Sequence, residues 1–96
     1  MQIFASEAHA ISADGRTIVG YVQTASSDSK IAPARWVDGK LDKIFTYDGA
    51  GNCYAISRDG SKAGGWGYQA DADGDKNRSA AIWEGDNVQY LSPIPT

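Results

Sequence analysis

The feature that most constrains this fold is an internal repeat, because short motifs recur in the same order along the chain. The Ala-Ile-Ser segment at Ala10–Ser12 returns 45 residues later at Ala55–Ser57. Other matches at 45 residues are Asp14-Gly15 with Asp59-Gly60 and Gly20-Tyr21 with Gly65-Trp66. Matches at 47 residues are Trp36 with Trp83, Leu41 with Val88 and Ile44 with Leu91. The sequence therefore predicts two copies of one structural unit.

Each copy is predicted to contain four short antiparallel strands, because apolar and polar residues alternate and Asp-Gly pairs mark tight turns. The predicted strands are about Ala8–Ser12, Thr17–Gln23, Ile31–Val37 and Lys40–Phe45, then Cys53–Ser57, Lys62–Tyr68, Ser79–Glu84 and Asn87–Leu91. The residues assigned to structural turns are Asp14, Gly15, Asp59 and Gly60. Pro33 lacks a backbone donor, so we expect it at the start of its strand or on an unpaired side.

The fold class expected is all-β, with two tandem four-stranded units of the size of a β-propeller blade. The first repeat is about 5–45 and the second about 50–92. Ile3-Phe4 resembles Ile44-Phe45, so residues 1–4 are expected to form a strand left over from a preceding repeat. A propeller needs roughly 4–8 blades to close, so neighbouring repeats or further copies of the chain should complete it. The alternative is a single small β-sandwich.

Composition excludes several classes of partner. The chain has 96 residues and a formal net charge of −3, which argues against nucleic acid and anionic membranes as partners. No apolar run is long enough to span a bilayer, and no signal peptide is expected at the start. Cys53 is the only cysteine, so an intramolecular disulfide cannot form.

The repeat resembles the bacterial extracellular HAF repeat. The matching residues are Ala10 to Gly15, Gly20, Ala34 to Trp36, Gly39 and Leu41, and again Ala55 to Gly60, Gly65, Ala81 to Trp83, Gly85 and Val88. The pattern departs from the family where a His-Ala-Phe-like triplet stands, at 33–35 and 80–82. The resemblance implies a propeller-like array in a secreted or autotransporter-type surface protein, and it brings no catalytic residues.

An acidic stretch lies where the second copy carries its two extra residues. Its candidate calcium ligands are Asp71, Asp73, Asp75 and Asn77. Alternating carboxylates of this kind resemble the start of a calcium loop, although Lys76 replaces the usual glycine. The alternative is a solvated hairpin loop, and no cofactor is required.

The aromatic residues Trp66, Trp36, Trp83 and Tyr68 form a candidate ligand-binding set. Such rings stack on sugar faces, whereas the structural alternative is packing in a small β core. Trp66 lies among glycines that leave its ring room for a ligand.

The function expected is that of a non-catalytic repeat module in a secreted or cell-surface bacterial protein, with a scaffolding or adhesive role. The alternative is a small oligomeric lectin that binds glycans between blades. His9 and Cys53 could suggest a nucleophilic pair, but nothing in the sequence orients His9, so no enzyme is expected.

Overall fold

The described part of the protein is built from β-strands, and it comprises residues 3–24, 31–45, 51–70 and 76–91 of a computed structural model. The strands are β1 (Ile3–Ile11), β2 (Thr17–Thr24), β3 (Ile31–Val37), β4 (Lys40–Ile44), β5 (Gly51–Ile56), β6 (Lys62–Ala70), β7 (Lys76–Glu84) and β8 (Asn87–Tyr90). Among these residues no helix is long and apolar enough to cross a membrane. The all-β class is confirmed.

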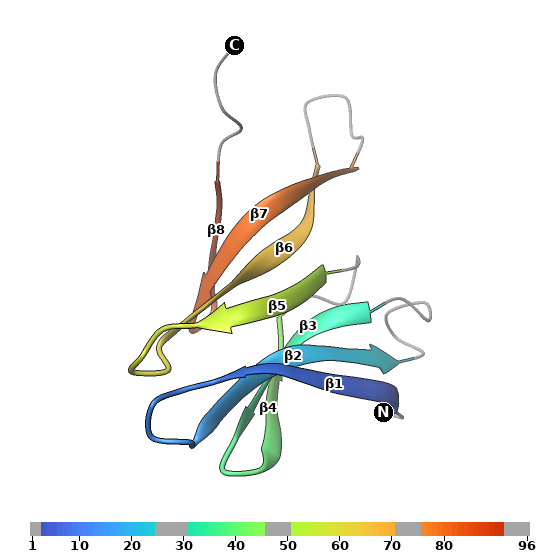
Figure 1. Cartoon of the computed structure of the whole chain (residues 1–96). Coiled ribbons are helices and arrows are strands. Elements are labelled where there is room, and N and C mark those ends of the chain that lie inside the picture. The colour runs from blue at the N-terminus through green and yellow to red at the C-terminus, as the bar shows by residue number, and fades with distance from the viewer. Residues whose placement is uncertain (1–2, 25–30, 46–50, 71–75, 92–96) are drawn as a thin grey trace.

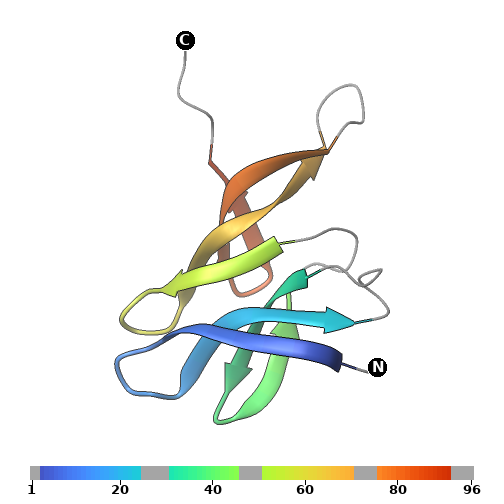
Figure 2. The ribbon, with the colours of Figure 1, turned by 45° about the vertical axis from the view of Figure 1, so that its right-hand side comes forward.

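The strands form two antiparallel sheets, each in chain order (Figure 1). The first sheet is β1-β2-β3-β4 and the second is β5-β6-β7-β8, so each repeat makes one sheet. β5 lies beside the first sheet, where it contacts β1, β2 and β3, and β6 to β8 lie beyond it (Figure 2). The expected pair of four-stranded units is therefore confirmed, and the arrangement also fits the sandwich alternative.

The turn between the first two strands of each sheet is built identically. The Ser12 hydroxyl donates to Asp14 at 2.7 Å, and the Ser57 hydroxyl donates to Asp59 at 2.8 Å. The turn glycines with positive φ are Gly15 (78°) and Gly60 (81°). A side chain disfavours this left-handed backbone, which explains the recurring Asp-Gly pair.

A β-bulge in the first strand of each sheet brings a carbonyl close to the second strand. The bulged residues are His9 in β1 and Tyr54 in β5. A Cβ atom added to Gly20 would lie 1.8 Å from the Glu7 carbonyl oxygen. One added to Gly65 would lie 1.8 Å from the Asn52 oxygen. The glycine of each Gly-aromatic pair is thus required by backbone contact.

The β1 strand is longer than expected at its start. Ile3 and Phe4 are continuous with the rest of β1, and Ile3 lies opposite Thr24 of β2. The prediction that residues 1–4 are a separate strand from a preceding repeat is therefore wrong for Ile3 and Phe4. The long partner strand β2 offers backbone groups as far as Thr24, and β1 extends to pair with them.

The fourth strands differ by one residue. Trp36 lies opposite Leu41, and the preceding residue, Arg35, lies opposite Lys43. Asp42 is therefore an extra, bulged residue that the β7–β8 pair lacks. Its carboxylate accepts a hydrogen bond from Arg35 Nε at 2.8 Å, which gives the bulge a local partner.

This bulge corrects the alignment of the two copies. The Phe45 N–H donates to the Pro33 carbonyl, and the Leu91 N–H donates to the Ala80 carbonyl, both at 2.9 Å. Leu91 is thus the counterpart of Phe45, and the expected match with Ile44 is wrong by one residue. The sequence pattern could not show the bulge, because the apolar residues on both sides of it look alike.

Pro33 lies inside β3, opposite Tyr21 of β2. Its carbonyl bonds to Phe45, so its nitrogen, which points to the same edge of the strand, faces the position beyond Ile44, where β4 has ended. Pro33 is therefore neither at the start of its strand nor on an unpaired side, and its missing donor falls opposite Phe45, one residue past the end of β4. The proline ring also lies against Gly51 of the second sheet, where an added Cβ would be 2.9 Å from Pro33 Cδ.

We name the two faces of each sheet by one residue on each, following the alternation of side chains along strands. In the first sheet the Val19 face carries Ala10, Val19 and Phe45, and the Trp36 face carries Val22, Ala34 and Trp36. In the second sheet the Trp83 face carries Cys53, Ala81 and Trp83, and the Trp66 face carries Trp66, Tyr68 and Arg78.

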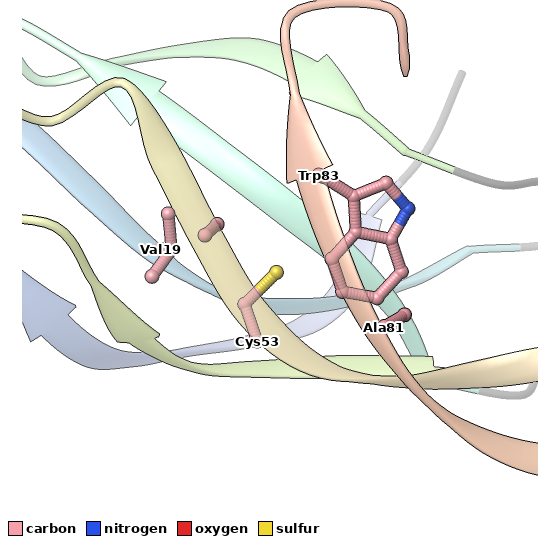
Figure 3. Packing of buried hydrophobic residues seen from close by; sticks show 5 residues of the cluster. Val19, Cys53, Ala81 and Trp83 are labelled. Atoms are coloured by element: carbon pink, nitrogen blue, oxygen red, sulfur yellow. The ribbon is translucent and has the colours of Figure 1, made fainter. Parts of the chain in front are cut away.

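The core between the sheets forms where the Val19 face packs against the Trp83 face. Val19 of β2 lies beside Cys53, Ala81 and Trp83 (Figure 3). Val19 and Cys53 are completely buried, and the Trp83 ring stacks on Phe45 with ring centroids 5.3 Å apart. Small residues let the sheets approach closely, and Trp83 is the largest buried side chain of this cluster. We call this contact the internal junction.

Two adjacent glycines give a matched test of the bulge contact. Gly65→Ala places a methyl group against the Asn52 carbonyl, whereas Gly64→Ala points into open space. We expect Gly65→Ala to lower the free energy of unfolding by about 3 kcal/mol, the upper range for overpacking. Gly64→Ala should leave it unchanged or slightly raised. Urea titration of both variants measures the difference, and equal effects would contradict the bulge account.

Candidate functional site

The structure separates the four aromatic residues that the sequence grouped as ligand-binding. Trp83 is 4% exposed and belongs to the internal junction. Trp36 packs on the opposite face of the first sheet, beside Val22 and Ala34. Only Trp66 and Tyr68 lie together, with ring centroids 5.7 Å apart and nearly perpendicular planes. Trp83 is therefore a core residue, because the first sheet covers the face that carries it.

Trp66 and Tyr68 belong to a row of side chains on the Trp66 face. The Arg78 guanidinium lies over the Trp66 ring, 4.0 Å from its centroid, in cation–π geometry. The Trp66 indole N–H donates to the Tyr54 hydroxyl at 3.3 Å. Tyr54 is 51% exposed and Tyr68 is 38% exposed. This aromatic row thus presents two open rings, while one face of Trp66 is covered.

The row continues across the internal junction through His9. The His9 ring lies 5.2 Å from that of Tyr54 and 5.9 Å from that of Tyr21. Tyr21 donates to Glu7 at 3.0 Å, and this hydrogen bond raises the pKa of the Tyr21 hydroxyl. Polar and aromatic groups of both sheets therefore meet at the edge formed by β1 and β5.

Asn52 is the buried polar residue at this edge. It is 4% exposed, and its Nδ2 lies 3.3 Å from His9 Nε2. If Nδ2 donates, His9 must accept through Nε2, which fixes the neutral tautomer. The other side-chain atom, Oδ1, has no hydrogen-bond partner in the described part of the chain. The surrounding packing leaves this oxygen no exposed surface, so it offers no opening for a ligand.

The geometry gives His9 and Cys53 different surroundings. Cys53 lies in the internal junction, and burial raises the pKa of its thiol to about 12. The thiol therefore stays protonated at neutral pH, where a nucleophilic cysteine must be ionised. His9 instead bonds to Asn52 and lies 3.9 Å from a carboxylate oxygen of Glu7. This arrangement supports a packing role for both residues.

A shallow groove separates the two Asp-Gly turns. Its walls are formed by Ala13, Asp14, Ser57, Arg58 and Asp59. The Ala13 N–H donates to the Arg58 carbonyl at 3.1 Å, so a backbone hydrogen bond joins the two turns. Each carboxylate is engaged by its own turn, which makes the four turn residues structural.

The turn hydrogen bonds hold both carboxylates in the ionised form. The backbone N–H of Arg16 is the main cause of a lowered pKa at Asp14. At Asp59 the backbone N–H and hydroxyl of Ser61, with the Ser57 hydroxyl, lower the pKa to about 2. A carboxylate that accepts several such bonds resists protonation.

The proposed calcium ligands Asp71, Asp73 and Asp75 lie outside the described residues. Asn77 lies in β7, with its backbone opposite Gln69. Within the described ranges there is no group of three or more His, Cys, Asp or Glu side chains that could hold a metal ion. Calcium binding by this loop stays a prediction.

Sequence reasoning missed two members of the aromatic row, Tyr54 and Arg78. Tyr54 is the bulged residue of β5, and a bulge turns an extra side chain to the surface. Arg78 lies opposite Tyr68 across the β6–β7 pair. Its proximity to Trp66 could have been found only from the strand register.

In comparisons with known proteins, no family model, no curated protein and no solved structure matches this chain. The function must therefore be inferred from the two stacked sheets and the faces that they leave open.

The acid sensitivity of the turns can be measured at Asp59. Because its pKa falls from the ordinary 3.8 to about 2 on folding, its contribution to stability is complete above pH 4 and disappears as the pH falls towards 2. We expect Asp59→Asn to be less stable at neutral pH and to lose less stability over that acid range. Urea midpoints measured from pH 5 to pH 2 compare the two, and parallel curves would contradict this account.

Proposed function

We propose that the chain is a non-catalytic repeat module whose task is scaffolding or adhesion within a larger, propeller-like assembly. The observation that carries the proposal is the internal junction, where one repeat buries a face of the next. Val19 comes from the first repeat, whereas Cys53 and Trp83 come from the second. A repeat of this kind obtains its core from its neighbour, as the units of repeat proteins do.

The shared construction of the two sheets supports the same function. Both sheets have the same Ser-Asp turn, the same bulge and the same glycine under a carbonyl. These features fix the shape of a unit and its stacking, and they place no reactive group in a cleft. A secreted or cell-surface bacterial setting is part of the proposal and rests on the resemblance to the HAF repeat.

A small lectin is the second candidate. The observation that favours it is the aromatic row, where Tyr54 and Tyr68 are exposed beside Arg78. Such residues stack on sugar rings and bond to hydroxyl groups. However, Arg78 covers one face of Trp66, the ring that the sequence favoured most for stacking. The scaffolding function is therefore supported better.

A chain with more repeats tests the scaffolding function. Leu91 would be followed by residues 46–50, which join the natural repeats, and then by a second copy from Ser6 onwards. We expect the four-repeat chain to melt in one transition, about 2–4 °C higher than the natural chain, because an added junction worth ~1 kcal/mol shifts the Tm of a chain of this doubled length by roughly 2–4 °C. Independent melting of the two halves at the original temperature would contradict the scaffolding function.

A glycan array tests the lectin alternative. We expect no glycan to bind specifically to the natural chain. Specific binding that is lost in Trp66→Ala and kept in Trp36→Ala would instead support a lectin, because Trp36 lies on the first sheet, away from the aromatic row. Both variants should first be shown to fold by circular dichroism.

A further inference from the structure

The internal junction joins two unlike faces. The Val19 face of the first sheet packs against the Trp83 face of the second, so the contact is heterologous. In the repeat alignment, Trp36 corresponds to Trp83, and Tyr21 of the Val19 face corresponds to Trp66. The Trp36 face and the Trp66 face, on which no other described sheet packs, are therefore counterparts of the two faces that already pack together. On the Trp36 face, Val22, Ala32 and Ala34 are buried, and the accessible part is lined by Ala8, Ile18 and Trp36.

At four positions of the repeat, the residue that lies outside the internal junction is more exposed than the equivalent residue inside it. The pairs, with the more exposed member first, are Ile11 and Ile56, Tyr54 and His9, Leu91 and Phe45, and Trp36 and Trp83. Ile11, Tyr54 and Leu91 are 58%, 51% and 43% exposed. Their counterparts are partly buried, and Ile56 and Phe45 pack on the core. These four positions are thus more exposed at the two ends, whereas Leu41 and Ile44 of the Trp36 face are less exposed than their counterparts Val88 and Tyr90.

The turns show the same difference. An added Cβ at Gly60 would lie 3.1 Å from the Thr17 hydroxyl of the other sheet, whereas one at Gly15 would meet nothing within 4 Å. The Ala13 N–H bonds to the Arg58 carbonyl in the internal junction. In a second junction of the same kind, the Arg58 N–H would meet the Ala13 carbonyl of the added unit.

We infer that a second copy of this chain docks its Trp36 face on the Trp66 face of the first, in the geometry of the internal junction. β1 of the added copy then lies along β5, β6 and β7, and Leu91 packs on the Trp36 ring as Phe45 packs on Trp83. This inference rests on the proposed function and adds the partner and the two faces that meet. Since the faces are unlike, repeated docking closes a ring or extends an open array.

The residues on these faces match those of the internal junction only in part, because Gly64 stands at the position of Val19 and one ion pair is missing. Asn52 bonds to His9 in the internal junction. The corresponding pair between copies is Glu7 of the added copy, which can accept, with the Tyr54 hydroxyl, which can donate.

Lys43 forms an ion pair with Asp86 across the internal junction. Its counterparts between copies are Gln89 and Gly39, so this ion pair is absent there. The contact between copies is therefore weaker than the internal junction, and the fraction of associated chains rises with concentration.

Two exposed apolar residues provide the test. Ile11→Asp places a charge on the Trp36 face, and Leu91→Asp places one beside the Trp66 face. We expect the natural chain to show a mass above 10.2 kDa that rises with concentration. Each variant alone should be monomeric, because every junction needs one intact face of each kind. An equimolar mixture should form a dimer of twice the chain mass, because one intact junction remains.

Light scattering and analytical ultracentrifugation measure these masses, with circular dichroism to confirm folding. Val88→Asp is the matched control, since Val88 is 44% exposed but shares the Trp83 face. It should associate like the natural chain. Single variants that still dimerise would show contact between like faces and overturn the inference. A natural chain or a mixture that stays monomeric would also overturn it, while a higher Tm for the four-repeat chain would leave the scaffolding function standing.

Discussion

The packing of Val19 against Cys53 and Trp83 is the interaction on which the rest of this structure depends. A single four-stranded sheet of this size cannot bury both of its faces, so each repeat needs a neighbour. The internal junction covers one face of each sheet, and the other face of the first sheet carries a second buried cluster around Val22, Ala32 and Ala34. The apolar residues Ile11 and Leu91 lie outside the internal junction and are exposed.

The two sheets can pack closely at the internal junction because β-bulges and tight turns fix the backbone at its edge. The bulges at His9 and Tyr54 direct these side chains to the β1–β5 edge, and the carbonyls beside them occupy the space above Gly20 and Gly65. In both sheets, a Ser-Asp turn then joins the first strand to the second. The shape of each sheet follows from this repeated geometry more than from any one side chain.

Strand positions and turns were predictable from the sequence, because alternation and Asp-Gly pairs report on local backbone. The bulge at Asp42 was not predictable, because one extra residue leaves the apolar pattern unchanged. As a result, Leu91 aligns with Phe45 and not with Ile44. The sequence also could not predict that Trp83 is buried more completely than Trp36. They occupy equivalent positions, and only the stacking of the sheets decides which one is buried.

Cys53 has a further consequence because of its place between the sheets. Its sulfur is enclosed and its pKa is about 12, so alkylating reagents can modify it only after the sheets move apart. The rate of modification then follows the equilibrium between closed and separated sheets. The only thiol of the chain thus acts as an intrinsic reporter of how often the two halves of the protein part in solution.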